Sequence, residues 1–196
     1  MVQHLSQVRK ELNNLQLDGL IITNPINRRY ISGFTGTAGV VIITENDALF
    51  ITDFRYVEQA KSEAKNYTII EHKGTLEDEL AKRIENLRIK NVGFEQDHVT
   101  FSTYKVFEEK FKANLIPTKG IIETLRMVKT DEEIAILKKA ASIADKAFEH
   151  ILNFISVGVS EMDIAHELEI YMRKQGATSS SFDIIVASGE RSALPH

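Results

Sequence analysis

The 196-residue chain contains no cysteine and no tryptophan, and only three prolines. Without cysteine it can form no disulfide framework, no thiolate zinc site and no cysteine nucleophile. It also lacks an apolar run long enough to span a bilayer, and its amphipathic start is not a signal peptide. These absences lead us to expect a soluble, cytoplasmic protein.

Neither positive nor negative charge is in large excess. The chain has 24 Lys and Arg against 28 Asp and Glu, a formal net charge of −4. A mildly acidic chain is a poor general binder of nucleic acid or of an anionic membrane, and no basic patch interleaved with aromatic residues occurs. Apolar residues make up 43% and charged residues 27%, which is typical of one or two globular domains. We therefore predict neither a nucleic-acid nor a membrane partner.

Strand and helix patterns alternate in the first part of the chain. Helices are predicted over 4–17, 53–65, from 75 onward and over 100–112, and strands over 20–23, 40–44, 48–52, 67–71, 91–95 and 115–118. Asp53 is the predicted N-cap of the second of these helices, and residues 30–36 are predicted to be a glycine-punctuated connection. The segment 45–47 has the length of a hairpin, so the alternation predicts an α/β domain with a mixed sheet flanked by helices.

Helix patterns dominate after about residue 123. Thr130 and Glu133 have the spacing of a capping box and predict the start of one long helix. Ser160 predicts the start of a second helix, and residues 182–187 predict an apolar strand.

A single strand cannot satisfy its own backbone groups or bury both of its faces. We therefore interpret residues 125–196 as an interdomain helix and the front part of a larger domain. A first domain is predicted over residues 1–124.

Several catalytic patterns are incomplete. Glycines 33, 36 and 39 are not followed by Gly-Lys-Ser/Thr, so tight turns are a better interpretation than a phosphate loop. His166-Glu167 lacks the second histidine of a zinc-protease motif, because position 170 is isoleucine, and we interpret this stretch as a solvated helix face. No Gly-x-Ser-x-Gly motif occurs, which argues against a serine hydrolase. Histidines 4, 72, 98 and 150 are isolated in the sequence.

One further segment and one further residue are candidates for a functional site. Asp53-Phe54-Arg55-Tyr56 lies at a strand-to-helix junction, where a helix cap with a local Asp–Arg pair is the simpler interpretation. His196 follows a predicted strand and a glycine turn, where side chains commonly face a cleft. A neutral imidazole there could donate to a substrate carbonyl or shuttle a proton.

Five segments together carry a resemblance to a known family. They are 18–25 (DGLIITNP), 30–36 (YISGFTG), 52–56 (TDFRY), 125–134 (LRMVKTDEEI) and 182–196 (FDIIVASGERSALPH). In this order they resemble the Xaa-Pro peptidases of the creatinase/prolidase group, which includes aminopeptidase P and Xaa-Pro dipeptidase.

The resemblance implies a creatinase/prolidase-like N-terminal α/β domain followed by an incomplete pita-bread α+β segment. It implies a metallopeptidase that cleaves the bond before proline in peptide substrates, with two divalent metal ions, manganese or cobalt, that activate a water molecule. The family's five metal ligands follow the motif that ends at His196. We therefore expect no metal ligand, no bound metal and no peptidase activity in this chain alone.

The resemblance also assigns roles to three residues. His196 matches the active-site histidine that contacts substrate, a catalytic and substrate-binding role. Arg55 and Tyr30 are candidate substrate-binding residues that face the catalytic cleft or a partner subunit. The complete protein is expected to be a homodimer.

Two alternatives stay open. The chain could belong to a non-catalytic peptide- or partner-binding module of the same fold, or to creatinase itself, which shares the fold and acts without metal. The ending Ser-Ala-Leu-Pro-His favours the peptidases. Whether the complete enzyme is a dipeptidase or an aminopeptidase is not decided by these residues.

Overall fold

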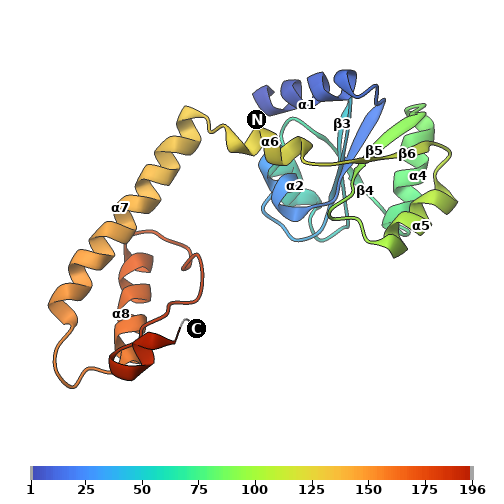
Figure 1. Ribbon diagram of the computed structural model, residues 1–196. Coiled ribbons are helices and arrows are strands. Elements are labelled where there is room, and N and C mark those ends of the chain that lie inside the picture. The colour runs from blue at the N-terminus through green and yellow to red at the C-terminus, as the bar shows by residue number, and fades with distance from the viewer. Residues whose placement is uncertain (1, 195–196) are drawn as a thin grey trace. The chain divides into compact units, whose positions relative to one another are not determined.

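The computed structural model describes residues 2–194, and the chain divides into two compact units at Val128–Lys129 (Figure 1). Within the described residues, no helix combines the length and the apolar character that crossing a bilayer requires.

The first unit alternates strands with helices. Its elements are α1 (Val2–Asn14), β1 (Gly19–Ile22), α2 (Pro25–Ser32), β2 (Val40–Thr44), β3 (Ala48–Thr52), α3 (Val57–Glu63), β4 (Thr68–Glu71), α4 (Leu76–Asn86), β5 (Asn91–Glu95), α5 (Phe101–Lys110), β6 (Asn114–Thr118) and α6 (Ile121–Met127).

The six strands form one mixed sheet in the order β4-β3-β2-β1-β5-β6. Strand β1 runs antiparallel to β2, with Ile21 opposite Ile42, and parallel to β5, with Ile21 opposite Phe94. Strands β3 and β4 are parallel, as are β5 and β6. The predicted α/β class with a mixed sheet is confirmed.

Both faces of the sheet are covered by helices. On one face, residues of α1, α2, α3 and α6 pack with the strand residues Leu20, Ile22, Val41, Ile43 and Phe50. On the other face, residues of α4 and α5 pack with Ile21, Ile42, Ile51 and Val92. Because both faces are buried, the central strands β1 and β2 are apolar at nearly every position.

Helix α2 replaces part of the connection expected at residues 30–36. The Asn24 side chain accepts from the amides of Ile26 (2.9 Å) and Asn27 (3.3 Å), and Pro25 occupies the first helical turn. The helix ends at Gly33, whose φ of 80° is left-handed. The Asn-Pro pair that indicated the end of a strand was thus also the signal for a helix start.

Helix α3 begins at Val57, so the prediction of a helix from Asp53 was wrong in its start. Asp53 Oδ1 instead accepts from the amide of Arg55 (3.0 Å), an arrangement that forms a turn. The local Asp–Arg pair predicted there is present.

The second unit contains α7 (Asp131–Phe154), α8 (Glu161–Lys174) and a short 3₁₀ turn at Gly189–Ala193. Both long helices start with a capping box. Thr130 N donates to Glu133 Oε2 (2.7 Å) and Glu133 N to Thr130 Oγ1 (3.2 Å). Ser160 and Asp163 make the equivalent reciprocal pair.

The strand predicted at residues 182–187 is absent, and that prediction was wrong. None of the described residues from 129 to 194 forms a strand, so this segment has no backbone to pair with. Phe182 and Ile185 are consequently 77% and 58% exposed.

Candidate functional site

The carboxyl ends of β1, β5 and β6 meet at one edge of the sheet, because these three strands are parallel neighbours. The chain that leaves β1 enters α2 on one face, whereas the chain that leaves β5 enters α5 on the other. A crevice forms at such a point in an open α/β sheet and is the usual ligand position of this architecture.

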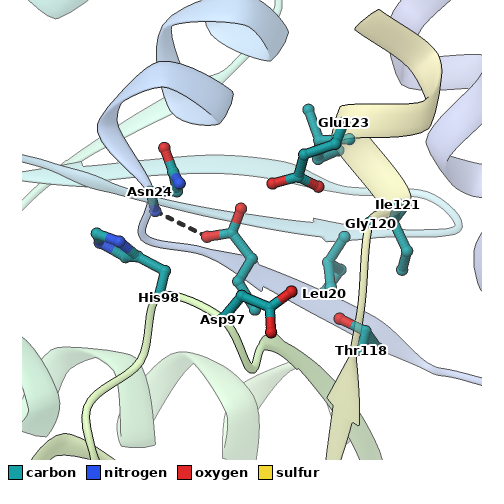
Figure 2. Close-up of a pocket in the computed structure, with 10 residues that line it drawn as sticks. Leu20, Asn24, Asp97, His98, Thr118, Gly120, Ile121 and Glu123 are labelled. Carbon is teal, nitrogen blue, oxygen red and sulfur yellow. Dashed lines mark hydrogen bonds between the residues drawn. The ribbon is translucent and has the colours of Figure 1, made fainter. Parts of the chain in front are cut away.

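A small pocket of about 30 Å³ lies at this edge. Figure 2 shows Asp97 and His98 reaching it from the segment after β5 and Glu123 from α6. The pocket is lined by Leu20, Asn24, Glu95, Asp97, His98, Thr118, Gly120, Ile121, Ile122 and Glu123. Its volume is that of about one water molecule, so the pocket is too small for an organic ligand.

Glu95, the last residue of β5, organises the start of α2. Its Oε2 accepts from the amides of Thr23 and Asn24, both at 2.7 Å. Its Oε1 accepts from Nδ2 of Asn27 at 2.7 Å. A carboxylate near the N-terminus of a helix also interacts favourably with the helix dipole.

Asn27 is fully buried and extends this network to α6. Its Nδ2 also donates to Glu123 Oε1 (2.6 Å), and its Oδ1 accepts from Arg126 Nη1 (3.0 Å). Four side chains from α2, β5 and α6 therefore form one polar network, in which Arg126 donates to the same Asn27 amide that joins the two carboxylates.

The residues of this edge do not form a metal centre. Within the part of the chain that the structure describes, no group of three or more His, Asp or Glu side chains could hold a metal ion. The carboxylates of Glu95 and Glu123 already accept from Asn27. The arrangement is suited to holding elements together and offers no evident catalytic chemistry.

Arg55 lies beyond the carboxyl end of β3, at this same edge of the sheet. It donates to both carboxylate oxygens of Asp53, from Nε (2.9 Å) and Nη2 (2.8 Å), and its guanidinium lies 5.3 Å from the ring centre of Tyr56. The Arg55 side chain, followed by its backbone amide, lowers the pKa of Asp53 to about 2. Both Arg55 and Phe54 are exposed, Phe54 by 76%.

Tyr30 lies on α2 and has different neighbours. Its hydroxyl donates to the Leu125 carbonyl of α6 (3.3 Å), and its ring stacks on His4 with centres 4.4 Å apart. Tyr30 thus takes part in the contact between α2 and α6, whereas Arg55 contacts Asp53 and Tyr56. His196, the third candidate, lies outside the described residues.

The loop between α2 and β2 is held by a buried arginine. Arg28 donates to the carbonyls of Gly36 (2.9 Å), Thr37 (3.1 Å) and Gly39 (2.6 Å). Burial lowers the pKa of this guanidinium. A Cβ at Gly36 would lie 2.3 Å from the Phe34 ring, so close packing requires glycine there. The tight-turn interpretation of these glycines agrees with this geometry.

In the second unit, His150, which is isolated in the sequence, has a partner on α8. His150 Nε2 lies 2.6 Å from Glu167 Oε1, and the His150 ring stacks on Tyr171 with centres 4.2 Å apart. Glu169 pairs with Arg173 on the exposed surface. His150 and Glu167 therefore join α7 to α8, and of the predicted solvated pair His166-Glu167 only His166 is exposed.

Asn27, Glu95, Glu123 and Arg28 are the structurally important polar residues that sequence reasoning missed. The nearest signal was the pair Asn24-Pro25, which starts α2 and would have placed Asn27 in its first turn. Pairing with Glu95 and Glu123, 68 and 96 residues away, leaves no local sequence signature.

Comparison with known proteins defines the class to which this architecture belongs. The family model described as Creatinase/Prolidase N-terminal domain matches residues 4–128, and that of Metallopeptidase family M24 matches residues 135–196. The chain belongs to the creatinase/prolidase family: its first unit is the family's N-terminal domain and is followed by part of an M24 peptidase segment.

Individual relatives support this membership. An uncharacterized peptidase of Bacillus subtilis, YqhT, is 51% identical over 193 residues, which cover 98% of this chain and 55% of the relative. The solved structure of an Xaa-Pro dipeptidase from Bacillus anthracis is 56% identical, with a TM-score of 0.93 over 100% of this chain and 55% of its own. The chain thus spans about half the length of the relatives it matches.

The N-terminal domain also has a solved counterpart by itself. The N-terminal domain of the cytoplasmic peptidase PepQ from Mycobacterium tuberculosis is 27% identical, with a TM-score of 0.58. The match covers 63% of this chain and 98% of that one. The fold of the first unit is therefore known from a chain of little more than this domain.

Proposed function

We propose that this chain is the N-terminal part of a metal-dependent Xaa-Pro peptidase, which hydrolyses the peptide bond before proline. The observation that carries the proposal is the match of 100% of the chain to an Xaa-Pro dipeptidase at 56% identity and a TM-score of 0.93. The match crosses the boundary between the two units, so it supports their combination as well as each fold.

The second unit supports the idea that more M24 sequence is needed for function. Helix α7 packs against α8 through one side, where Ala147 and Ile151 are buried. A separate stripe of α7, spaced at helical intervals, is exposed: Leu137 by 54%, Phe148 by 63% and Leu152 by 58%. A helix that is apolar on two sides is normally covered on both, and we propose that the remaining M24 segment covers this stripe.

The described residues do not fit a pair of divalent metal ions, since none of their His, Asp and Glu side chains form a suitable group. We propose that the ligands come from the segment that the relatives carry beyond the matched region. The chain by itself is then expected to be inactive.

His196 is proposed to contact substrate in the complete enzyme. Arg55 is proposed to bind substrate or a partner subunit, which its exposed position supports. Tyr30 is also proposed to face substrate or a partner subunit, and its hydroxyl donates to the Leu125 carbonyl.

We further propose a cytoplasmic homodimer. The compartment is proposed by analogy with PepQ, a cytoplasmic peptidase, and the dimer from the family resemblance. Light scattering of the complete protein tests the dimer. A monomeric mass over the micromolar range would contradict it.

The test of function joins the chain to the remaining 45% of the Bacillus subtilis relative and adds Mn²⁺. The joined protein is expected to hydrolyse Xaa-Pro dipeptides, and the chain alone is not. Dipeptides without proline serve as the substrate control. Equal hydrolysis of both dipeptide types, or cleavage of creatine instead, would remove the Xaa-Pro assignment, and binding without hydrolysis would indicate a non-catalytic module.

Two substitutions in the joined protein test the site residues. His196→Ala is expected to lower kcat/KM by about 10²–10⁴-fold, the usual contribution of a group that takes part in proton transfer. Arg55→Ala is expected to raise KM with a smaller change in kcat. Lys61→Ala, an exposed change on α3, is the control and should leave both constants unchanged.

A further inference from the structure

The 3₁₀ turn of the second unit is attached to the start of α8 by one carboxylate (Figure 1). Glu161, the first residue of α8, accepts through Oε1 from the amide of Ser188 (2.8 Å) and from its hydroxyl (3.2 Å). Its other oxygen, Oε2, lies 3.1 Å from Arg191 Nε. Among the described residues, every hydrogen bond or ion pair between residues 182–194 and α8 ends on Glu161. Both of its carboxylate oxygens therefore serve this one attachment.

The 3₁₀ turn is also held together internally. Leu194 N donates to the Arg191 carbonyl (3.0 Å), and the Ser192 hydroxyl donates to the Gly189 carbonyl (2.7 Å). Gly189 has a left-handed φ of 54°, which glycine adopts without a steric cost. Because these contacts are local, they shape the turn but do not attach it to a helix.

Apolar packing contributes little to the attachment. Each of residues 188–194 is exposed, so no buried side chain anchors the turn. The Glu161 side chain, by contrast, is only 26% exposed. Hydrogen bonds to an ionised carboxylate are roughly twice as strong as those between neutral groups. The position of the turn on α8 therefore depends mainly on Glu161.

Few backbone torsions separate the 3₁₀ turn from His196, which lies outside the described residues. The sequence places His196 five residues after Arg191. Leu194 is extended, with φ −93° and ψ 127°, the conformation that is favoured before proline. Position 195 is proline, whose ring removes one free backbone torsion. A shift of the turn is therefore expected to shift the histidine that is proposed to contact substrate.

We propose that Glu161 is a positioning residue for His196. By attaching the 3₁₀ turn to the start of α8, its carboxylate restricts the positions that the imidazole can take and so raises the rate of hydrolysis. The inference rests on the proposed Xaa-Pro peptidase and on the substrate contact proposed for His196. It assigns Glu161 itself no contact with substrate.

The attachment is tested in the chain alone, where no hydrolysis is needed. Glu161→Ala removes both carboxylate oxygens, and the Ser188 amide is expected to exchange its hydrogen about tenfold faster, as followed by NMR. Glu169→Ala is the matched control, because it removes a carboxylate of the same helix that pairs with Arg173 instead. It should leave the Ser188 exchange rate unchanged.

The consequence for catalysis is tested in the chain joined to the remaining segment of the Bacillus subtilis relative. Glu161→Ala is expected to lower kcat for an Xaa-Pro dipeptide by about 10–10²-fold, with a smaller change in KM, because a displaced group is less effective in the transition state. Glu161→Gln keeps the acceptor for Ser188 and is expected to recover most of this loss. Arg191→Ala removes only the contact with Oε2 and is expected to give a smaller loss, so it tests the attachment even where Glu161→Ala does not fold.

A double substitution separates positioning from general stability. If Glu161 acts through His196, adding Glu161→Ala to His196→Ala lowers kcat little further than His196→Ala alone, because the imidazole to be positioned is already gone. A general loss of stability would instead lower kcat by the same factor in both backgrounds.

Faster Ser188 exchange in Glu161→Ala but not in Glu169→Ala, together with the non-additive loss of kcat, supports the proposal. Unchanged Ser188 exchange, an unchanged kcat in Glu161→Ala, or additive losses in the double variant overturn it. If the joined protein with Glu161 intact does not cleave Xaa-Pro dipeptides, the proposed function fails and this role of Glu161 with it. That result is distinct from an active joined protein that tolerates Glu161→Ala, which would remove the positioning role alone.

Discussion

The two units of this chain are built from similar helices but differ in what the helices cover. In the first unit, six helices lie against the two faces of one sheet, and nearly all the buried apolar residues are here. In the described part of the second unit, only Ala147 and Ile151 among the apolar residues are buried.

The difference shows that well-formed helices do not by themselves make a core. Both α7 and α8 have complete capping boxes, which are better N-terminal caps than α3 has. Capping satisfies the backbone at a helix end and is a local effect of about 1 kcal/mol. Burial needs a second layer, which the first unit has in its sheet and residues 129–194 do not supply.

The largest expected effect is on thermal unfolding when the two units are produced as separate proteins. Residues 1–128 are expected to unfold in one cooperative thermal transition, because both faces of their sheet are covered. Residues 129–196 are expected to keep helical circular dichroism, melt without a sharp transition and bind the dye ANS. A sharp melt of residues 129–196 without ANS binding would contradict the comparison.

Two leucine-to-alanine substitutions, one in each unit, test the same comparison within the whole chain. Leu20→Ala removes a fully buried side chain of β1 and is expected to destabilise the first unit by about 2–5 kcal/mol in urea unfolding. Leu152→Ala removes the same atoms from a side chain that is 58% exposed, and is expected to change stability by about 0.5 kcal/mol or less. A comparable loss in both variants would show that α7 is covered in solution.

The smallest expected effect is the pH dependence of stability that comes from the exposed Asp53–Arg55 pair of the first unit. Because the Arg55 guanidinium lowers the pKa of Asp53 to about 2, below the value near 3.9 of an unfolded chain, their pairing stabilises the fold above about pH 4. This contribution is lost as the pH falls through about 2. Arg55→Gln is expected to raise the Asp53 midpoint toward 3.9 in a carboxyl NMR titration.

Lys61→Gln, which removes a different surface pair on α3, serves as the control for that titration. It should leave the Asp53 midpoint near 2. If the Asp53 midpoint is the same in Arg55→Gln as in the unchanged chain, the pair does not persist in water.

Much of the fold could be predicted from the sequence because its signals are local. Capping pairs such as Thr130–Glu133 and the hairpin-length segment 45–47 between two apolar runs depend only on neighbours in the chain. The strand expected at 182–187 failed for the opposite reason, since a strand needs a partner from elsewhere. Helix α2 was overlooked because Asn24-Pro25 was interpreted only as the end of a strand.

The site was less predictable. Arg55 and Tyr30 were found through motifs, and the structure shows their neighbours, but their proposed contacts with substrate involve groups outside the chain. Asn27 escaped notice because its role depends on burial and on Glu95 and Glu123, which only the folded sheet brings near. A polar residue in a helix carries no sequence mark of being buried.

Hydrogen exchange of residues 182–187 tests the central claim most directly. The amides of these residues are expected to exchange rapidly in the chain alone, where they belong to no strand, and to become protected when the chain is joined to the remaining segment of the Bacillus subtilis relative. Equal exchange rates in the two proteins would contradict the view that the second unit is completed by further M24 sequence.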